Sequence, residues 1–129
     1  MAMQMQTDFQ NIGTQFCQHY YQIFDTNRAG LGPLYSDASL LTFEDSQVQG
    51  SGQIVQKLAS LPFRTVRHQV IKADCQPCPG SMNVLIFVTG NLFVDESQNP
   101  LKFAQVFQLA QAPGGNYYCQ NDMFRLNIG

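Results

Sequence analysis

The sequence contains little charge and no tryptophan. Of its 129 residues, 7 are Lys or Arg and 9 are Asp or Glu, so charged residues make up 12% of the chain. That is about half of the usual share of roughly 25%. The 17 glutamines supply much of the polar character instead. A chain with seven cations and a net charge of −2 can neutralise few phosphate groups. The composition therefore argues against a nucleic-acid-binding protein.

Long apolar runs are absent too. No stretch approaches the roughly 18 residues of a membrane-spanning helix, so we expect no membrane insertion. Met1–Gln10 lacks the basic and apolar regions of a secretory signal peptide. A length of 129 residues fits one domain, residues 1–129, with a sizeable buried core. We therefore expect a soluble intracellular protein.

Cysteine is sparse, and one close pair stands out. Cys75 and Cys78 form a C-x-x-C motif, whereas Cys17 and Cys119 are isolated in the sequence. A structural zinc site usually needs a second close pair. A redox motif should begin a helix, but Pro77–Gly80 predicts a turn. The pattern favours two incidental thiols over a metal or redox site, and we expect no cofactor.

Apolar residues near the start of the chain recur at spacings of three and four, which predicts an amphipathic helix. Its inward face holds Phe9, Ile12, Phe16, Tyr20 and Ile23. Thr7 and Gln10 form a capping-box pattern at its start, and Asp25–Asn27 ends it. A short helix is expected over Ala29–Tyr35. A third helix, stopped by Pro62, has an apolar face of Ile54, Val55, Leu58 and Leu61.

The remaining segments predict strands. Leu40–Glu44 is one, with a turn leading into Gln47–Gln49. After Pro62 the apolar period becomes two, and four strand candidates follow: Val66–Val70, Asn83–Phe93, Leu101–Ala110 and Asn116–Leu126. The links between them are too short for crossover helices, so the strands should be antiparallel neighbours. We expect an α+β fold with the helices on one face of a strongly bent, five-stranded antiparallel sheet.

One strand predicts self-association. Val84–Val88 is apolar at every position. The segment containing Phe103, Val106, Phe107 and Leu109 is also rich in apolar residues, although not at every position. An antiparallel sheet with one wet face should alternate instead. A second copy packed on the outer face would cover it, giving a homodimer; the alternative is a monomer whose extra face is curled or locally capped. Lys at Phe107 would bury an unpaired charge at that interface or in the core.

Two histidines occur, and each has a structural and a chemical interpretation. His19 lies on the flank of the first helix's apolar stripe, where a satisfied boundary histidine is expected. His68 shares a strand face with Val66 and Val70, so its side chain could point into the core side. A histidine oriented by a carboxylate could act as a general base, although a lone histidine on an apolar face is more often structural.

Acidic residues gather at two strand ends. Glu44–Asp45 ends one strand and Asp95–Glu96 ends another. They are either solvated turn residues or an acidic rim around an apolar opening. Aromatic residues close to these ends in sequence support the rim: Phe43, Phe63, Phe93 and Phe124. Such a rim would attract and orient a basic ligand or partner, and spacing alone leaves both interpretations open.

Many short segments in a fixed order form a larger pattern. In the first half they are Gln18–Asp25, Arg28, Leu31, Tyr35, Asp37–Ser39, Leu41–Glu44 and Gln49–Gly50. In the second half they are Leu61–Phe63, Asp74, Gln76–Pro77, Asp95–Pro100, Gln105–Phe107 and Asn121–Leu126. In this order, over nearly the whole chain, they resemble the nuclear transport factor 2 family.

The resemblance implies a cone-shaped α+β fold, a homodimer and no catalysis. It implies a carrier that binds the small GTPase Ran in its GDP-bound form and phenylalanine-glycine repeats of nucleoporins, and so imports Ran into the nucleus. The expected location is the cytoplasm and nucleus, with a concentration at the nuclear pore.

The resemblance also assigns residues. In the family, an apolar cavity accepts an aromatic side chain of the GTPase, and rim acids pair with basic residues beside it. The matching rim acids are Glu44 and Asp95. The matching wall residues are Phe43, Leu61, Phe63, Val66, Leu101 and Phe124. Phe9 matches a family aromatic that receives the nucleoporin repeat near the subunit junction.

This chain departs from the family pattern at a few positions. Phe43 and Phe9 stand where many members carry tryptophan, which reduces the contact area and removes the indole donor. Ser97 stands where an acid is common, which removes one charge from the rim. The C-x-x-C motif is not part of the family pattern.

A second class of function remains to be weighed. The same cone fold hosts dehydratases, isomerases and hydrolases that use pocket carboxylates and histidine, so fold analogy alone does not decide. An enzyme would need a buried acid–base pair, such as His68 with Asp122 or Asp95. The whole-chain motif set favours the carrier, whereas a small pocket closed to protein side chains would favour the enzyme.

Overall fold

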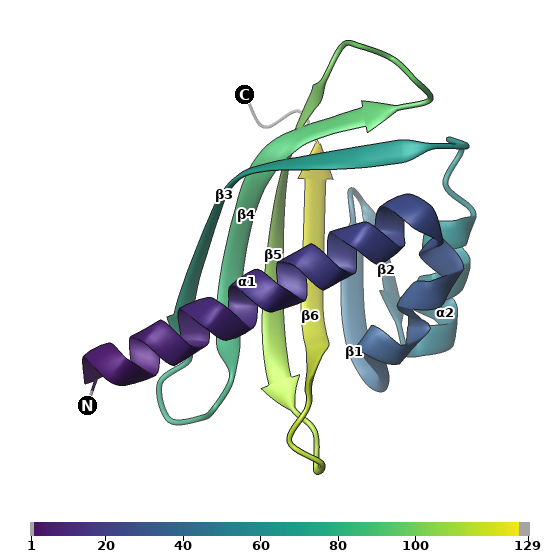
Figure 1. Cartoon of the computed structure of the whole chain (residues 1–129). Helices are drawn as coiled ribbons and strands as arrows, with labels where there is room; N and C mark the ends of the chain where they lie inside the picture. Colours follow the sequence, from purple (N-terminus) through teal and green to yellow (C-terminus); the bar gives the residue numbers. More distant parts are fainter. Residues whose placement is uncertain (1, 127–129) are drawn as a thin grey trace.

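The computed structural model describes the backbone of residues 2–126 and the side chains of residues 8–126. Within this part, the helices are α1 (Ala2–Thr26), the 3₁₀ helix η1 (Arg28–Leu34) and α2 (Ser51–Ala59). The strands are β1 (Tyr35–Phe43), β2 (Ser46–Gln49), β3 (Val66–Pro77), β4 (Val84–Val94), β5 (Leu101–Gln111) and β6 (Tyr117–Leu126). The predicted α+β class is confirmed (Figure 1).

All six strands form one curved sheet in the order β2-β1-β6-β5-β4-β3. The predicted antiparallel meander over β3 to β6 is confirmed. The expectation of five antiparallel strands is wrong, because residues 2–126 form six strands and β1 runs parallel to β6. This pairing joins segments that are far apart in the sequence, so neither a turn motif nor a hydrophobic period predicts it.

Two of the helices differ from the predicted ones. α1 begins at Ala2, so Thr7 lies within the helix and the capping-box prediction is wrong. The short second helix is of the 3₁₀ type, with Pro33 inside it. α2 begins at Ser51, directly after Gly50, whose φ of 92° is a conformation that glycine adopts readily. The predicted end of α1 is confirmed at Thr26.

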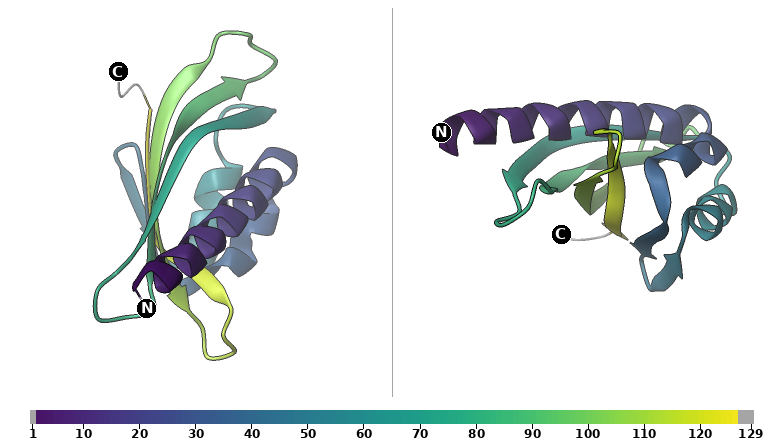
Figure 2. Two further views of the ribbon diagram at one scale, coloured as in Figure 1. Left: turned by 60° about the vertical axis from the view of Figure 1, so that its left-hand side comes forward. Right: turned by 90° about the horizontal axis from the view of Figure 1, so that it is seen from below.

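α1 lies across one side of the bent sheet, and α2 lies beyond it near β1 and β2 (Figures 1 and 2). β5 alternates inward and outward, with Phe103 and Phe107 fully buried on the inner face. The rings of Phe16 and Tyr20 pack on Phe107, with centroids 5.2 and 4.8 Å away. Phe107 therefore belongs to the core rather than to an outer interface. No helix within residues 2–126 is long and apolar enough to span a lipid bilayer.

The outer face of the sheet carries an apolar row. Phe87, Val106 and Met123 are directly paired across β4, β5 and β6, and we call them the outer row. The side chains of Phe87 and Met123 remain 46% and 52% exposed. Beside the row, the amide of Asn121 donates to Gln108 at 2.7 Å. The continuous apolar pattern of β4 thus places side chains on both faces, and α1 covers the inner one.

Candidate functional site

One end of the sheet collects the rim and wall residues assigned by the family resemblance. β1, β4 and β6 end there, whereas β3 and β5 begin there. We call this end the mouth. Glu44 follows β1 and Asp95 follows β4. The wall residues come from β1, β3, β5, β6 and the link between α2 and β3: Phe43, Val66, Leu101, Phe124, Leu61 and Phe63.

A stack of aromatic rings forms part of the mouth. Phe43 and Phe124, paired in register on β1 and β6, have ring centroids 4.6 Å apart and planes 5° apart. Phe103 of β5 continues the stack beyond Phe124, at 5.6 Å and 16°. Phe124 is buried and Phe43 is half-buried, so the stack ends in accessible aromatic surface. Phe103 was not predicted as a wall residue, although its alternation with Phe107 placed it on the inner face.

The other wall residues are buried to different degrees. Phe63 is half-buried beneath the guanidinium group of Arg28, which lies 4.8 Å from the ring centroid. Arg28 also donates a hydrogen bond to the Phe63 carbonyl at 3.0 Å. Val66 is buried and lines a hollow of about 260 Å³ with Arg28 and Arg64. Leu61 is half-buried, and Leu101 is 37% exposed.

Glu44 is held in place by a backbone hydrogen bond. The backbone N–H of Leu126 donates to its Oε1, which ties the turn after β1 to the end of β6. Glu44 also has a φ of 56°, in the left-handed region that non-glycine residues seldom adopt. It is half-buried, so it is neither a free surface acid nor a fully solvated turn residue.

Asp95 is held in a similar way. Its Oδ1 accepts hydrogen bonds from the backbone N–H groups of Thr65 at 2.9 Å and Arg64 at 2.7 Å. These two hydrogen bonds, followed by the nearby guanidinium groups of Arg64 and Arg28, lower the pKa of the Asp95 carboxyl. Glu96 follows with a φ of 64°, and its carboxylate lies 3.7 Å from the guanidinium of Arg64. Sequence reasoning did not single out Arg64.

His68 has a carboxylate partner, but not a predicted one. Its Nδ1 lies 2.6 Å from Asp25 Oδ1, and its backbone N–H donates to Asp25 Oδ2 at 2.9 Å. The side chain is 1% exposed, in contact with aromatic rings such as that of Tyr21. The pairing with Asp122 or Asp95 that the enzyme alternative would need is not formed, and both of those carboxylates are hydrogen-bonded to other groups.

The expectation that His68 points into the core side is confirmed, because its side chain is 1% exposed. Val70, expected on the same strand face, is 42% exposed next to an irregularity in the register between Val70 and Lys72. His19, expected at the boundary of the core, is exposed on α1. The buried side of α1 is occupied by larger aromatic residues instead.

Asp122 is the centre of a buried polar network. Its Oδ2 accepts from the hydroxyls of Tyr35 at 2.7 Å and Tyr20 at 3.2 Å, and its Oδ1 accepts from Gln105 at 2.8 Å. Tyr21 donates to the Gln105 carbonyl oxygen at 2.7 Å. Burial raises the pKa of Asp122 to about 6, against the effect of these hydrogen bonds. The network joins α1, β1, β5 and β6.

The C-x-x-C motif lies apart from the mouth. Cys75, in β3, approaches α1 at Gly13, where a Cβ atom would collide with the Cys75 sulfur. Cys78 follows β3, and both thiols are free. The predicted turn is confirmed, with Gly80 at a φ of 84°. Within the described residues, no three His, Cys, Asp or Glu side chains are grouped to hold a metal ion.

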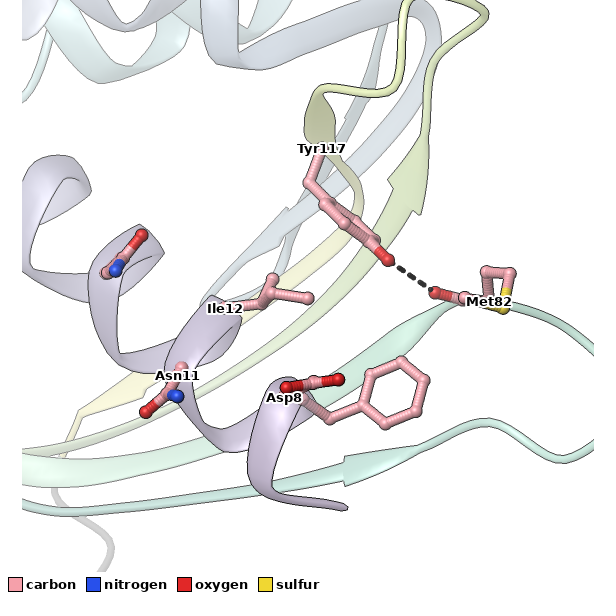
Figure 3. Close-up of a pocket in the computed structure, with 7 residues that line it drawn as sticks. Asp8, Asn11, Ile12, Met82 and Tyr117 are labelled. Carbon is pink, nitrogen blue, oxygen red and sulfur yellow. Dashed lines mark hydrogen bonds between the residues drawn. The ribbon is translucent and has the colours of Figure 1, made fainter. Parts of the chain in front are cut away.

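Phe9 lies at the opposite end of the sheet from the mouth. It is 2% exposed and lines a hollow of about 360 Å³ between α1, the β3–β4 loop and the start of β6. The hydroxyl of Tyr117 donates to the Met82 carbonyl at 3.2 Å across this hollow (Figure 3). The remaining lining residues are Asp8, Asn11, Ile12 and Gln15. Phe9 thus forms a wall of a hollow rather than a protruding aromatic.

The comparisons with known proteins agree over nearly the whole chain. Residues 12–126 match the nuclear transport factor 2 domain model. The chain is 53% identical over 119 residues to nuclear transport factor 2 of Emericella nidulans, covering 92% of this chain and 95% of that protein. The structure of nuclear transport factor 2 from Cryptosporidium parvum is 50% identical, with a TM-score of 0.87 and coverage of 92% and 94%.

A more distant structure shares only the fold. A putative scytalone dehydratase from Novosphingobium aromaticivorans is 10% identical, with a TM-score of 0.80 and coverage of 98% of this chain and 89% of that one. Enzymes and non-enzymes can share such a fold, so this likeness carries no information about activity.

The raised pKa of Asp122 predicts a pH-dependent stability. In the unfolded chain its pKa should return to about 3.9. The unfolded state then releases its proton first, so the free energy of unfolding falls as the pH rises from about 4 to about 6, by about 2–3 kcal/mol. Asp122→Asn should remove this part of the dependence, as measured by urea denaturation at pH 4.5, 5.5 and 7.

Asp74→Asn is the matched control, because the Asp74 side chain is 64% exposed. It should leave the difference between pH 4.5 and pH 7 as in the unmodified protein. Equal pH dependence in Asp122→Asn and the unmodified protein would show that burial does not shift the Asp122 equilibrium.

Proposed function

Because this chain belongs to the nuclear transport factor 2 family, we propose that it carries GDP-bound Ran into the nucleus while binding phenylalanine-glycine repeats of nucleoporins. Its relatives are named nuclear transport factors, from which we infer a transport role without catalysis. We place the protein in the cytoplasm and nucleus, with a concentration at the nuclear pore. The enzyme alternative is less favoured, because His68 is paired with Asp25 rather than with Asp122 or Asp95 and its side chain is only 1% exposed, which leaves a substrate little access to it as a general base.

The mouth supports GTPase binding by its chemistry. The stack that ends in half-buried Phe43 offers apolar surface to an aromatic side chain. Glu44 and Asp95 each use one carboxylate oxygen for backbone N–H groups. Each has a second oxygen for a basic residue of a partner, and the acids are already fixed before binding, which reduces its entropic cost. This combination of apolar surface and oriented acids is the observation that carries the proposal.

The hollow at Phe9 supports repeat binding at a separate place. It combines the apolar Phe9, Ile12 and Met82 with the aromatic Tyr117, which suits a phenylalanine side chain. Because this hollow and the mouth lie at opposite ends of the sheet, the two partners would bind without competing for the same residues.

The outer row supports a homodimer. Phe87, Val106 and Met123 form a continuous apolar strip across three strands, on the face opposite α1. Pairing with the same strip of a second copy would remove it from water about a two-fold axis.

Glu44→Lys tests the proposed role of the mouth. A desolvated interfacial charge pair loses about 2–5 kcal/mol when one partner is removed, roughly 30- to 5,000-fold in affinity. The lysine also adds repulsion toward a basic partner. Calorimetry should therefore show at least roughly 30-fold weaker binding to GDP-bound Ran, whereas retention on a nucleoporin-repeat column should be unchanged.

Glu44→Gln is the matched variant, because its amide oxygen can still accept from the Leu126 N–H. It should melt close to the unmodified protein and bind the GTPase more weakly, but less weakly than Glu44→Lys. The melting point of Glu44→Lys should fall only slightly, since one hydrogen bond is worth about 0.5–1.5 kcal/mol. Unchanged GTPase affinity in both variants would show that Glu44 has only its structural role.

Phe87→Lys tests the homodimer. A charge in the middle of the outer row would be desolvated without a partner in the dimer, so sedimentation velocity at micromolar concentration should show a folded monomer. The unmodified protein should sediment as a dimer. Phe107→Lys is the contrasting variant on the inner face and should unfold the chain, because Phe107 is fully buried. A monomeric unmodified protein would contradict the dimer.

Phe9→Leu tests the repeat site. Leucine keeps most of the apolar volume of this buried residue but removes the aromatic ring, so the fold should persist while retention on a repeat column decreases. Phe9→Ala should reduce retention further and also lower stability by about 3–5 kcal/mol. Full retention of Phe9→Leu beside intact GTPase binding would exclude Phe9 from the repeat site.

A further inference from the structure

We propose that Arg64 competes with a basic partner for the acids of the mouth and thereby limits how tightly that partner binds. The inference rests on the proposed binding of a basic surface of the GTPase at this place. It assigns a role in setting the binding affinity to a residue outside the apolar wall and the acidic rim.

The backbone fixes Arg64 next to the acids. Its N–H donates to Asp95 Oδ1 at 2.7 Å, and the N–H of Thr65 donates to the same oxygen at 2.9 Å. The turn after β4 is thereby tied to the segment before β3. Because these bonds involve the backbone, any side chain at position 64 starts from the same point beside Asp95 and Glu96.

The side chain of Arg64 is the adjustable charge at this corner. It reaches Glu96 at 3.7 Å, but the two side chains are 76% and 82% exposed, so the pair is weakly held. Arg28, the other guanidinium near Asp95, is fixed by its hydrogen bond to the Phe63 carbonyl and its contact with the Phe63 ring. A partner can therefore displace Arg64 from Glu96 more easily than it can move Arg28.

The number of charges near Asp95 determines how strongly Arg64 affects the binding of a basic partner. The run Asp95–Glu96–Ser97 supplies two carboxylates, since Ser97 is neutral. Arg64 offsets one of them. A lysine or arginine of a partner that approaches these acids is repelled by Arg64 and must also replace it at Glu96. Such an effect acts mainly on the association rate and decreases as salt screens the charges.

Arg64→Gln isolates this effect, and Lys72→Gln is its matched control. The control removes the same charge from a similar exposed pair, Lys72 with Asp74 at 3.9 Å with side chains 71% and 64% exposed, in the middle of β3 away from the mouth. We expect Arg64→Gln to bind immobilised GDP-bound Ran about two- to tenfold more tightly than Lys72→Gln at low salt. Raising the salt to about 0.5 M should remove most of the difference.

Glu96→Gln, alone and combined with Arg64→Gln, tests the competition directly. If Arg64 occupies Glu96, the loss of Glu96 should weaken binding more in the Arg64→Gln background than in the unmodified protein. Melting curves of all variants should be nearly the same, because the backbone bonds to Asp95 remain.

Three results would overturn the inference. Equal affinities of Arg64→Gln and Lys72→Gln would show that Arg64 does not compete. Weaker binding by Arg64→Gln would show that Arg64 contacts the partner itself. If the unmodified protein and every variant failed to bind the GTPase, the proposed function would fall together with this inference, whereas the first two results leave the proposed function standing.

Discussion

The buried carboxylate of Asp122 is the constraint around which the inner face of this protein is arranged. It accepts hydrogen bonds from Tyr20 of α1, Tyr35 of β1 and Gln105 of β5. A buried carboxylate that lost any of these partners would be costly, so the helix and the three strands must keep one relative position. Within the described residues, no buried side-chain polar atom lacks a hydrogen-bond partner. The aromatic stack at Phe43 and Phe124 is built on the same two strands, β1 and β6.

Three surfaces are separated by this arrangement. The mouth lies where β1, β4 and β6 end, the hollow at Phe9 lies toward the opposite end, and the outer row faces away from α1. A carrier that holds a cargo and contacts the pore needs sites that do not compete for the same residues. A sheet with one covered face provides such separation, because a single small interface cannot span both of its ends and its open face. The proposed functions therefore follow from placement as much as from residue type.

Much of the fold could be predicted from local pattern. The period of three to four residues in α1 and the period of two in β3 to β6 are strong signals, and Pro and Gly mark the turns between the strands. The predictions that were wrong concern features that local sequence patterns do not determine. The parallel pairing of β1 with β6 joins distant segments, and the start of α1 at Ala2 is not marked by the capping pattern at Thr7.

The candidate site was predictable as a set of residues but not as a set of interactions. The acids at strand ends were visible in the sequence, yet their hydrogen bonds to the N–H groups of Arg64, Thr65 and Leu126 were not. The sequence predicts Asp25 at the end of a helix, but not its bond to His68, which spans 43 positions of the chain. Such partners depend on tertiary contacts, which residue spacing does not encode.

We propose that the mouth binds a GTPase in one nucleotide state. Titration calorimetry of the unmodified protein with Ran loaded with GDP and, in parallel, with GTP tests this most directly. We expect saturable binding of the GDP-bound form and no measurable binding of the GTP-bound form at the same concentrations. Binding of neither form, or a preference for the GTP-bound form, would contradict it.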